Sequence, residues 1–176
     1  MKVLFLDIDG VLNSENWFGY RLYCIKNNMF NEVINFVNTT DECIKHKLSM
    51  IDDRAIANLN RIVEETGCKV VLSSSWRSCV EDENTLTEYI LKLKGFNYEL
   101  YDVTPRLWFN DFSIRRGEEI KLWMDKESEK NEIESFVILD DDSDMLPEQM
   151  NNFIQIDGQV GLTDKDVFAA IEILNR

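Results

Sequence analysis

A run of apolar residues near the amino terminus, residues 3–6, leads directly into two carboxylates, Asp7 and Asp9, followed by Gly10. A short apolar run that ends in an Asp-Gly turn is typical of a strand buried on both faces, and such strands occur mainly in parallel sheets covered by helices. We therefore expect a strand over residues 2–7. Its carboxyl end would present the two acids at the edge of the sheet.

Further apolar runs predict the rest of the sheet. Strands are expected at residues 69–73, 136–139 and 153–156, with a short one at 98–102. Apolar residues at helical spacing predict helices over residues 51–66, 84–94 and 117–126, a short helix near 146–151 and a last helix beginning at Thr163. Capping boxes are expected at Ser49–Asp52 and Thr163–Asp166, with Gly67 ending the first of these helices. This alternation predicts an α/β domain with a mostly parallel sheet.

The chain has 176 residues, which suits one domain spanning 1–176. Residues 14–48 fit no strand of this sheet and contain a candidate helix near 29–37. We expect them to form a small insertion after the first strand. The segment could be a cap over substrate, or its aromatic residues could be the core of the inserted helix.

Charge and composition exclude several classes of protein. The net charge of −14 repels polyanions, so we expect no extended nucleic-acid binding, although a local basic patch could hold a nucleic-acid end. No apolar run approaches the roughly 20 residues that span a bilayer, and the amino terminus lacks the pattern of an export signal, so we expect no membrane association. The four cysteines form no CxxC pair, which favours reduced thiols in a cytoplasmic protein.

Polar clusters follow three of the expected strands: Asp7-Ile8-Asp9-Gly10, Ser73-Ser74-Ser75 and Asp140-Asp141-Asp142. In parallel sheets the active site lies beyond the carboxyl ends of the strands, so neighbouring strands would bring the clusters together. Aspartate oxygens without nearby His or Cys favour a hard cation, most simply Mg²⁺. A carboxylate can act as nucleophile in phosphoryl transfer, and Arg115 or Arg116 could neutralise the transferring group.

Four motifs resemble those of the haloacid dehalogenase-like (HAD) hydrolase superfamily: VLFLDIDGV, VVLSSSW, an Arg in RRGEEIKLWM, and ILDDDSDM. The resemblance covers most of the chain and implies a Rossmann-like three-layer sandwich with a small cap inserted after the first strand. The stretches SSSWR, RRGEEIKLWM and ILDDDSDM more narrowly resemble small HAD domains predicted for RNA-repair proteins and phage-type phosphatases.

The resemblance also implies roles for individual residues. Asp7 would be the nucleophile that becomes an aspartyl-phosphate, and Asp9 the general acid/base. Ser74 fits the second motif, with Ser73 or Ser75 as alternatives if the register differs. Arg116 would stand where the family more often has Lys, with Arg115 and Lys121 as alternatives.

Further positions follow from the same motifs. Mg²⁺ would be held by the carboxylate of Asp7, the backbone carbonyl of Asp9, and Asp140 and Asp141, with Asp142 or Asp144 in support. Gly10, Ser75 and Arg115 would contact the substrate. Trp76 and Arg77 could line the site or pack beside it, and we expect His46 to have a surface or packing role.

The predicted function is a Mg²⁺-dependent phosphomonoesterase. Its partner would be a phosphorylated substrate, such as a nucleotide, a nucleic-acid 3′-phosphate end, a sugar phosphate or a phosphoprotein. Two alternatives remain: a receiver-like signalling domain that accepts phosphate, and a non-catalytic binding module on the same fold. Each cluster also has a simpler interpretation, as a turn, a helix cap, a solvated acidic loop or a surface charge pair.

Overall fold

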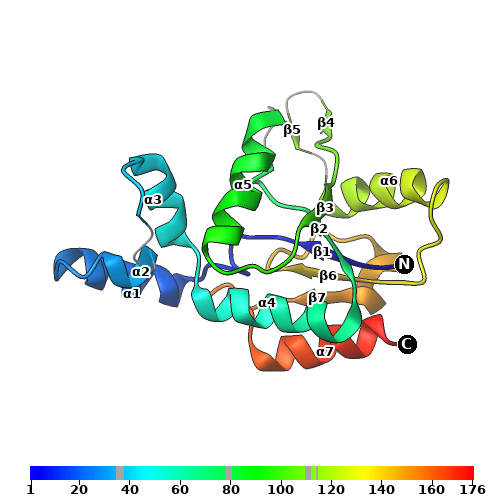
Figure 1. The fold of residues 1–176 in the computed structure, drawn as a ribbon. Helices are drawn as coiled ribbons and strands as arrows, with labels where there is room; N and C mark the ends of the chain where they lie inside the picture. The colour runs from blue at the N-terminus through cyan, green and yellow to red at the C-terminus, as the bar shows by residue number, and fades with distance from the viewer. Residues whose placement is uncertain (35–37, 78–80, 110–111, 114) are drawn as a thin grey trace.

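The central feature of the computed structural model is an all-parallel sheet of five strands in the order β3-β2-β1-β6-β7 (Figure 1). The structure describes residues 1–34, 38–77, 81–109, 112–113 and 115–176. The strands are β1 Lys2–Leu6, β2 Lys69–Leu72, β3 Leu100–Val103, β6 Ser135–Asp140 and β7 Phe153–Gln155. The predicted α/β class and parallel sheet are confirmed, and β1 lies in the middle of the sheet.

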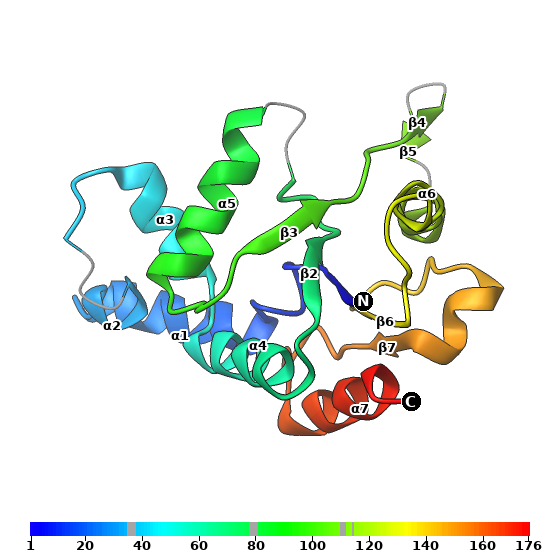
Figure 2. The same ribbon diagram turned by 45° about the vertical axis from the view of Figure 1, so that its right-hand side comes forward.

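Helices cover both faces of this sheet, because β1 has no polar face to leave in water. Val3 and Phe5 point to one face and pack in a cluster with Ile120 and Trp123 of α6 (Arg116–Ser128). The Phe5 and Trp123 rings meet edge to face, with centroids 5.3 Å apart. On the other face, Leu4 and Leu6 join the cluster that includes residues of α4 (Asp53–Thr66), α5 (Glu81–Leu93) and α7 (Asp164–Leu174). Figure 2 shows these layers from a second direction.

Helix ends follow the predicted capping in two places and differ in one. Gly67 ends α4 in the left-handed conformation (φ 67°), and Asp166 accepts hydrogen bonds from the backbone and side chain of Thr163 at the start of α7. The predicted box at Ser49 was wrong, because Ser49 is a buried residue of α3 (Glu42–Met50) and Asp52 alone caps α4 through the Arg54 N–H. The short helix near 146–151 is a 3₁₀ helix, Pro147–Asn152.

The described residues of the segment 14–48 form α1 (Glu15–Lys26), α2 (Asn31–Ile34) and most of α3, which ends at Met50. These helices gather beside α5 at the end of the molecule away from the termini (Figure 1). The predicted helix at 29–37 coincides only with α2, and residues 35–37 lie outside the described part. Helix α1 was missed because its apolar residues do not form one stripe: Trp17 and Cys24 are buried, whereas Tyr20 and Tyr23 are exposed.

A buried lysine attaches this segment to the rest of the domain. Lys94, after α5, is 3% exposed and donates to the carbonyl of Val33 at 3.1 Å. Its Nζ also lies 2.5 Å from Asp53 Oδ1 and 5.4 Å from the centre of the Trp17 ring. One ammonium group therefore joins α1, α2 and α4.

Other expectations concern smaller features. A two-stranded antiparallel hairpin, β4 (Trp108–Phe109) and β5 (Phe112–Ser113), was not predicted. Cys24, Cys43 and Cys68 are free thiols, and Cys79 lies outside the described residues. His46 is exposed beside Arg21, as expected of a surface residue. Among the described helices, none has the length and apolar character needed to cross a bilayer.

Candidate active site

The three polar clusters lie at the carboxyl ends of neighbouring strands. Leu6, the last residue of β1, is paired with Leu72 of β2 on one side and with Leu139 of β6 on the other. The next residues, Asp7, Ser73 and Asp140, are therefore level with one another at the same edge of the sheet. This is the convergence that the sequence predicted.

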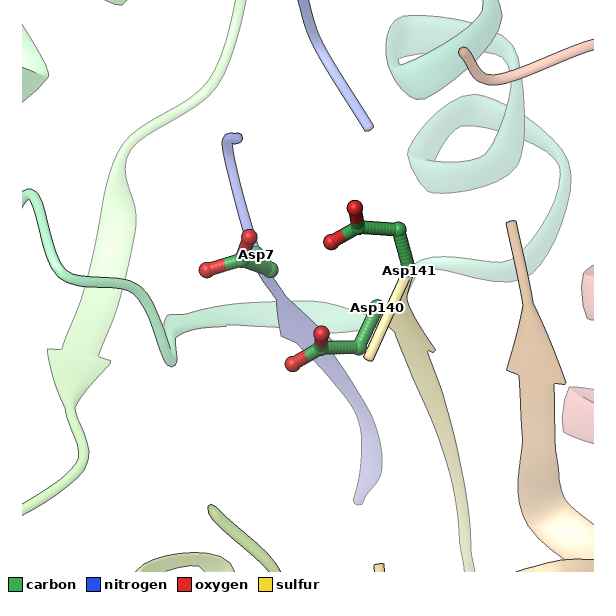
Figure 3. A group of neighbouring side chains, drawn as sticks. All are labelled: Asp7, Asp140 and Asp141. Carbon is green, nitrogen blue, oxygen red and sulfur yellow. The ribbon is translucent and has the colours of Figure 1, made fainter. Parts of the chain in front are cut away.

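Three carboxylates converge there: those of Asp7, Asp140 and Asp141 (Figure 3). Each can offer one oxygen such that all three oxygens lie within 4.8 Å of one another. Asp7 and Asp140 are almost completely buried, at 4% and 2% exposure. Carboxylate oxygens at this spacing are the donors that a hard divalent cation such as Mg²⁺ binds.

The pKa values of these acids reflect the cost of burying negative charge. Burial raises the pKa of Asp7 to about 7, and Arg116 opposes the rise. Burial and the neighbouring Asp7 raise the pKa of Asp140 to about 8, again against Arg116. Oxygens Oδ1 of Asp7 and Oδ2 of Asp140 are buried and accept no hydrogen bond from the described residues. Their only cationic neighbour among the described residues is Arg116, at more than hydrogen-bonding distance. The carboxylates therefore still fit a divalent cation, which would lower both pKa values.

Arg116, the first residue of α6, faces both buried acids. Its Nη2 lies 3.6 Å from Asp7 Oδ1, and its Nε lies 3.5 Å from Asp140 Oδ2. Both distances exceed those of ordinary charge-assisted hydrogen bonds, so the guanidinium attracts the acids without being bound tightly to either. Its Nη1 is also buried and unpartnered within the described chain. The group can therefore still bind the oxygens of a phosphoryl group.

A close approach of α6 to the loop after β6 puts Arg116 in this position. The backbone N–H of Arg116 donates to Asp144 Oδ2 at 2.8 Å. A Cβ at Gly117 would lie only 2.6 Å from the backbone nitrogen of Leu146, so a larger residue would separate the two segments. Gln149 links them further, because its amide donates to the Gly117 carbonyl and accepts from the Leu146 N–H.

Asp9 lies apart from the three acids, and its carboxylate accepts three hydrogen bonds. Oδ1 accepts from the Trp76 indole and from the Asn13 amide, both at 3.0 Å, and Oδ2 accepts from the Ser75 hydroxyl at 3.0 Å. Among the described residues, the carboxylate of Asp9 is not a member of the group that could hold a metal ion. The two acids of the first motif thus have different surroundings.

Ser74 joins the loops that follow β1 and β2. Its side chain is fully buried, and its Oγ accepts from the backbone N–H groups of Ile8 and Trp76, each at 3.3 Å. A hydrogen bond from Ser74 lowers the pKa of Asp7. Ser73 points elsewhere, toward the hydroxyl of Thr104 at 3.4 Å. Of the three serines, Ser74 is the one beside Asp7.

The remaining predicted residues lie around this centre. Gly10 has φ 73°, and a Cβ on it would overlap the Asp141 carboxylate. Arg115 is exposed, and no ion pair or hydrogen bond joins its side chain to the described residues. Lys121 pairs with Asp125 on the surface of α6 at 2.9 Å. Of the three cations that the sequence offered, Arg115, Arg116 and Lys121, Arg116 is therefore the one next to the acids.

Sequence reasoning missed several contacts of the site, although it had named Trp76 and Arg77 without choosing a role for them. Arg77 is buried and paired with Glu119 of α6, whose other carboxylate oxygen accepts the Leu107 N–H. Burial, followed by the charge of Arg116, lowers the pKa of Arg77. Asn13 was not considered. Its only sequence signal is its position three residues after Gly10, whose N–H donates to the Asn13 amide oxygen.

The raised pKa values predict how the metal-free protein responds to pH. Asp140 and Asp7 release their protons near pH 4 in the unfolded chain but near pH 8 and 7 in the folded one. Between these values the folded state binds more protons, so its free energy of unfolding should fall as the pH rises. This can be measured by urea unfolding of wild type and Asp140→Asn, with EDTA to remove metal. The free energy of unfolding of the variant minus that of the wild type should rise by about 1 kcal/mol or more from pH 5 to 8. A constant difference would contradict the raised pKa.

Comparison with known proteins agrees with the architecture and the motifs. The chain matches the family model described as "HAD domain in Swiss Army Knife RNA repair proteins" over residues 3–167, nearly its whole length. No curated protein and no solved structure gave a match. The family match spans the strands, the insertion and all four motifs. The chain therefore belongs to the family of HAD domains in Swiss Army Knife RNA repair proteins.

Proposed function

We propose that the chain is a Mg²⁺-dependent phosphomonoesterase that forms an aspartyl-phosphate on Asp7. Membership of the HAD family supports a hydrolase. The observation that carries the proposal is the pairing of two acids with opposite surroundings. Asp7 is buried beside Arg116 and two further carboxylates, whereas Asp9 is held apart by three hydrogen-bond donors.

The proposed reaction has two steps. The Asp7 carboxylate attacks phosphorus, the ester P–O bond breaks, and the leaving oxygen takes a proton from Asp9. Water then attacks phosphorus with Asp9 as base, which releases phosphate and restores Asp7. Arg116 stabilises the negative charge on the phosphoryl oxygens throughout.

Asp7, Asp140 and Asp141 would hold Mg²⁺, together with the backbone carbonyl of Asp9 that the family resemblance implies. The ion, when bound, supplies the positive charge that lets an anionic carboxylate approach an anionic phosphate. Asp144 would support the site by holding the Arg116 backbone in place.

For the substrate we propose a nucleotide or a phosphorylated nucleic-acid end. The family description, which names RNA repair proteins, supports this class. The net charge of −14 favours a short segment or an end over an extended polyanion. The three free thiols among the described cysteines support a cytoplasmic location.

The direct experiment is hydrolysis of 4-nitrophenyl phosphate with Mg²⁺ and with EDTA. Turnover that requires the metal would support the proposal and justify a screen of nucleotides and 3′-phosphorylated oligonucleotides. Binding of Mg²⁺ and a phosphate analogue without turnover of any of these substrates would favour a non-catalytic binding module.

Asp9→Asn separates a hydrolase from a receiver-like domain, which accepts phosphate without an acid/base at this position. The variant should still form the aspartyl-phosphate from 4-nitrophenyl phosphate, because this leaving group departs without a proton. It should release phosphate at least about 100-fold more slowly, since no base activates the water. Quenched-flow measurement would show a burst of 4-nitrophenol. With substrate that carries a labelled phosphoryl group, acid-stable labelled protein would accumulate. Steady turnover at the wild-type rate would contradict the role of Asp9.

A further inference from the structure

Both oxygens of the Asp9 carboxylate are held by side chains from two loops. Two nitrogen donors, the Trp76 indole and the Asn13 amide, lie 3.0 Å from Oδ1. The Ser75 hydroxyl lies 3.0 Å from Oδ2. The indole and amide N–H groups can only donate, whereas a hydroxyl can donate or accept. Oδ2 is therefore the oxygen whose partner can adapt when the carboxylate gains or loses a proton.

Trp76 is held rigidly enough to orient its neighbour. Its backbone N–H donates to Ser74 Oγ at 3.3 Å, and its carbonyl accepts from Thr87 Oγ1 of α5 at 3.2 Å. Its ring is partly buried and packs against the main hydrophobic cluster. Trp76 is thus fixed by contacts with the loop after β2 and with α5, and its indole in turn holds the carboxylate of Asp9.

The insertion reaches the same tryptophan. Nζ of Lys47, on α3, lies 4.7 Å from the centre of the Trp76 ring, within the range of a cation–π interaction. Helix α3 therefore contacts the tryptophan whose indole donates to Asp9.

We propose that Trp76 is the positioning residue of the acid/base, which fixes Oδ1 of Asp9 so that Oδ2 exchanges the proton with the leaving oxygen. Lys47 holds the Trp76 ring and so connects the insertion to this function. Ser75 was expected from the sequence to bind substrate; in this proposal its hydroxyl instead donates to Oδ2 of Asp9. The proposal rests on the proposed phosphatase reaction, in which the P–O bond breaks as the Asp7–phosphorus bond forms and the Oδ2 proton moves to the departing oxygen.

The test compares two substrates that differ in their need for this proton. Phenolate is a poor leaving group and needs the acid, whereas 4-nitrophenolate does not. Trp76→Phe keeps an aromatic side chain and removes the indole N–H, so kcat/KM should fall about tenfold more for phenyl phosphate than for 4-nitrophenyl phosphate. Lys47→Met should shift the same ratio in the same direction by about two- to fivefold. Equal losses on both substrates in Trp76→Phe would overturn the proposal.

Trp123→Phe is the matched control. It also removes an indole N–H that donates to an aspartate, here Asp102 at 2.8 Å, but on α6 and away from the acids. The substrate ratio of this variant should stay at the wild-type value. A shift equal to that of Trp76→Phe would mean that the effect is a general loss of packing, and would overturn the proposal.

A second measurement does not depend on activity. In ¹H–¹⁵N spectra the four tryptophans should each give an indole signal. Asp9→Asn should move the signal of Trp76, which is assigned by its loss in Trp76→Phe. The signal of Trp17, which donates to the Ser49 carbonyl at 3.0 Å, should stay in place. An unmoved Trp76 signal would overturn the contact itself. If the wild type hydrolyses neither aryl phosphate, the proposed function is in question, while the spectrum still decides whether Trp76 holds Asp9.

Discussion

Replacing Asp7 with Asn is expected to lower turnover of an aryl phosphate by at least about 10³-fold, because the amide cannot attack phosphorus. The change is nearly isosteric, and the buried carboxylate it replaces already has a pKa raised to about 7. The neutral side chain should therefore not destabilise the metal-free fold. The measurement is steady-state hydrolysis with Mg²⁺, together with urea unfolding to verify the fold.

Asp157→Asn is the control for this experiment. Asp157 follows β7, is exposed, and accepts a hydrogen bond from the Gln159 N–H. A receiver-like domain accepts its phosphate on an Asp after a later strand, and Asp157 has such a position. We expect wild-type turnover in this variant. Loss of phosphate acceptance in Asp157→Asn, with Asp7→Asn unaffected, would contradict the phosphatase and favour the receiver-like alternative.

Gly10→Ala is expected to reduce activity about 100-fold and to weaken Mg²⁺ binding. Gly10 has φ 73°, which costs an L-residue about 1–2 kcal/mol, and the added methyl would lie 2.8 Å from Asp141 Cβ and closer still to its carboxylate. Gly158 lies close to the same carboxylate, because a Cβ there would be 2.9 Å from Asp141 Oδ2. The displaced acid would disturb a site in which small misplacements are costly. Metal titration and hydrolysis measure both effects.

The same substitution at Gly19 provides the comparison. Gly19 lies within α1, and a Cβ there would meet nothing within 4 Å. Gly19→Ala should raise the free energy of unfolding by about 0.5–1 kcal/mol and leave turnover unchanged. Wild-type metal affinity and activity in Gly10→Ala would show that the approach of Gly10 to Asp141 does not shape the site.

Much of the sheet could be predicted because its signals are local. Strands β1, β2 and β6 are short apolar runs that end in polar residues, and this pattern depends only on neighbours in sequence. The insertion could not be predicted in the same way. Most of the apolar residues of α1 are exposed, and its position depends on Lys94, which lies far away in the sequence.

The choice among similar residues also needed the folded chain. Ser73, Ser74 and Ser75 are equivalent in sequence, but the turn that follows β2 directs them to three different partners. Ser73 faces Thr104, Ser74 faces Asp7 and Ile8, and Ser75 faces Asp9. Arg115 and Arg116 are equally close to the start of α6. Helix α6 begins at Arg116 and packs closely at Gly117. As a result, Arg115 is exposed, whereas Arg116 faces Asp7 and Asp140.

The sequence by itself determined the α/β class, the strand ends that carry the acids, and the four motifs of the HAD superfamily, because each is written in consecutive residues. Only the tertiary structure decided which side chains complete the site. The indole of Trp76 meets Asp9 across 67 positions of sequence, and Asp144 meets the backbone of Arg116 across 28. Such contacts depend on how strands and helices pack together, and no local pattern records that packing.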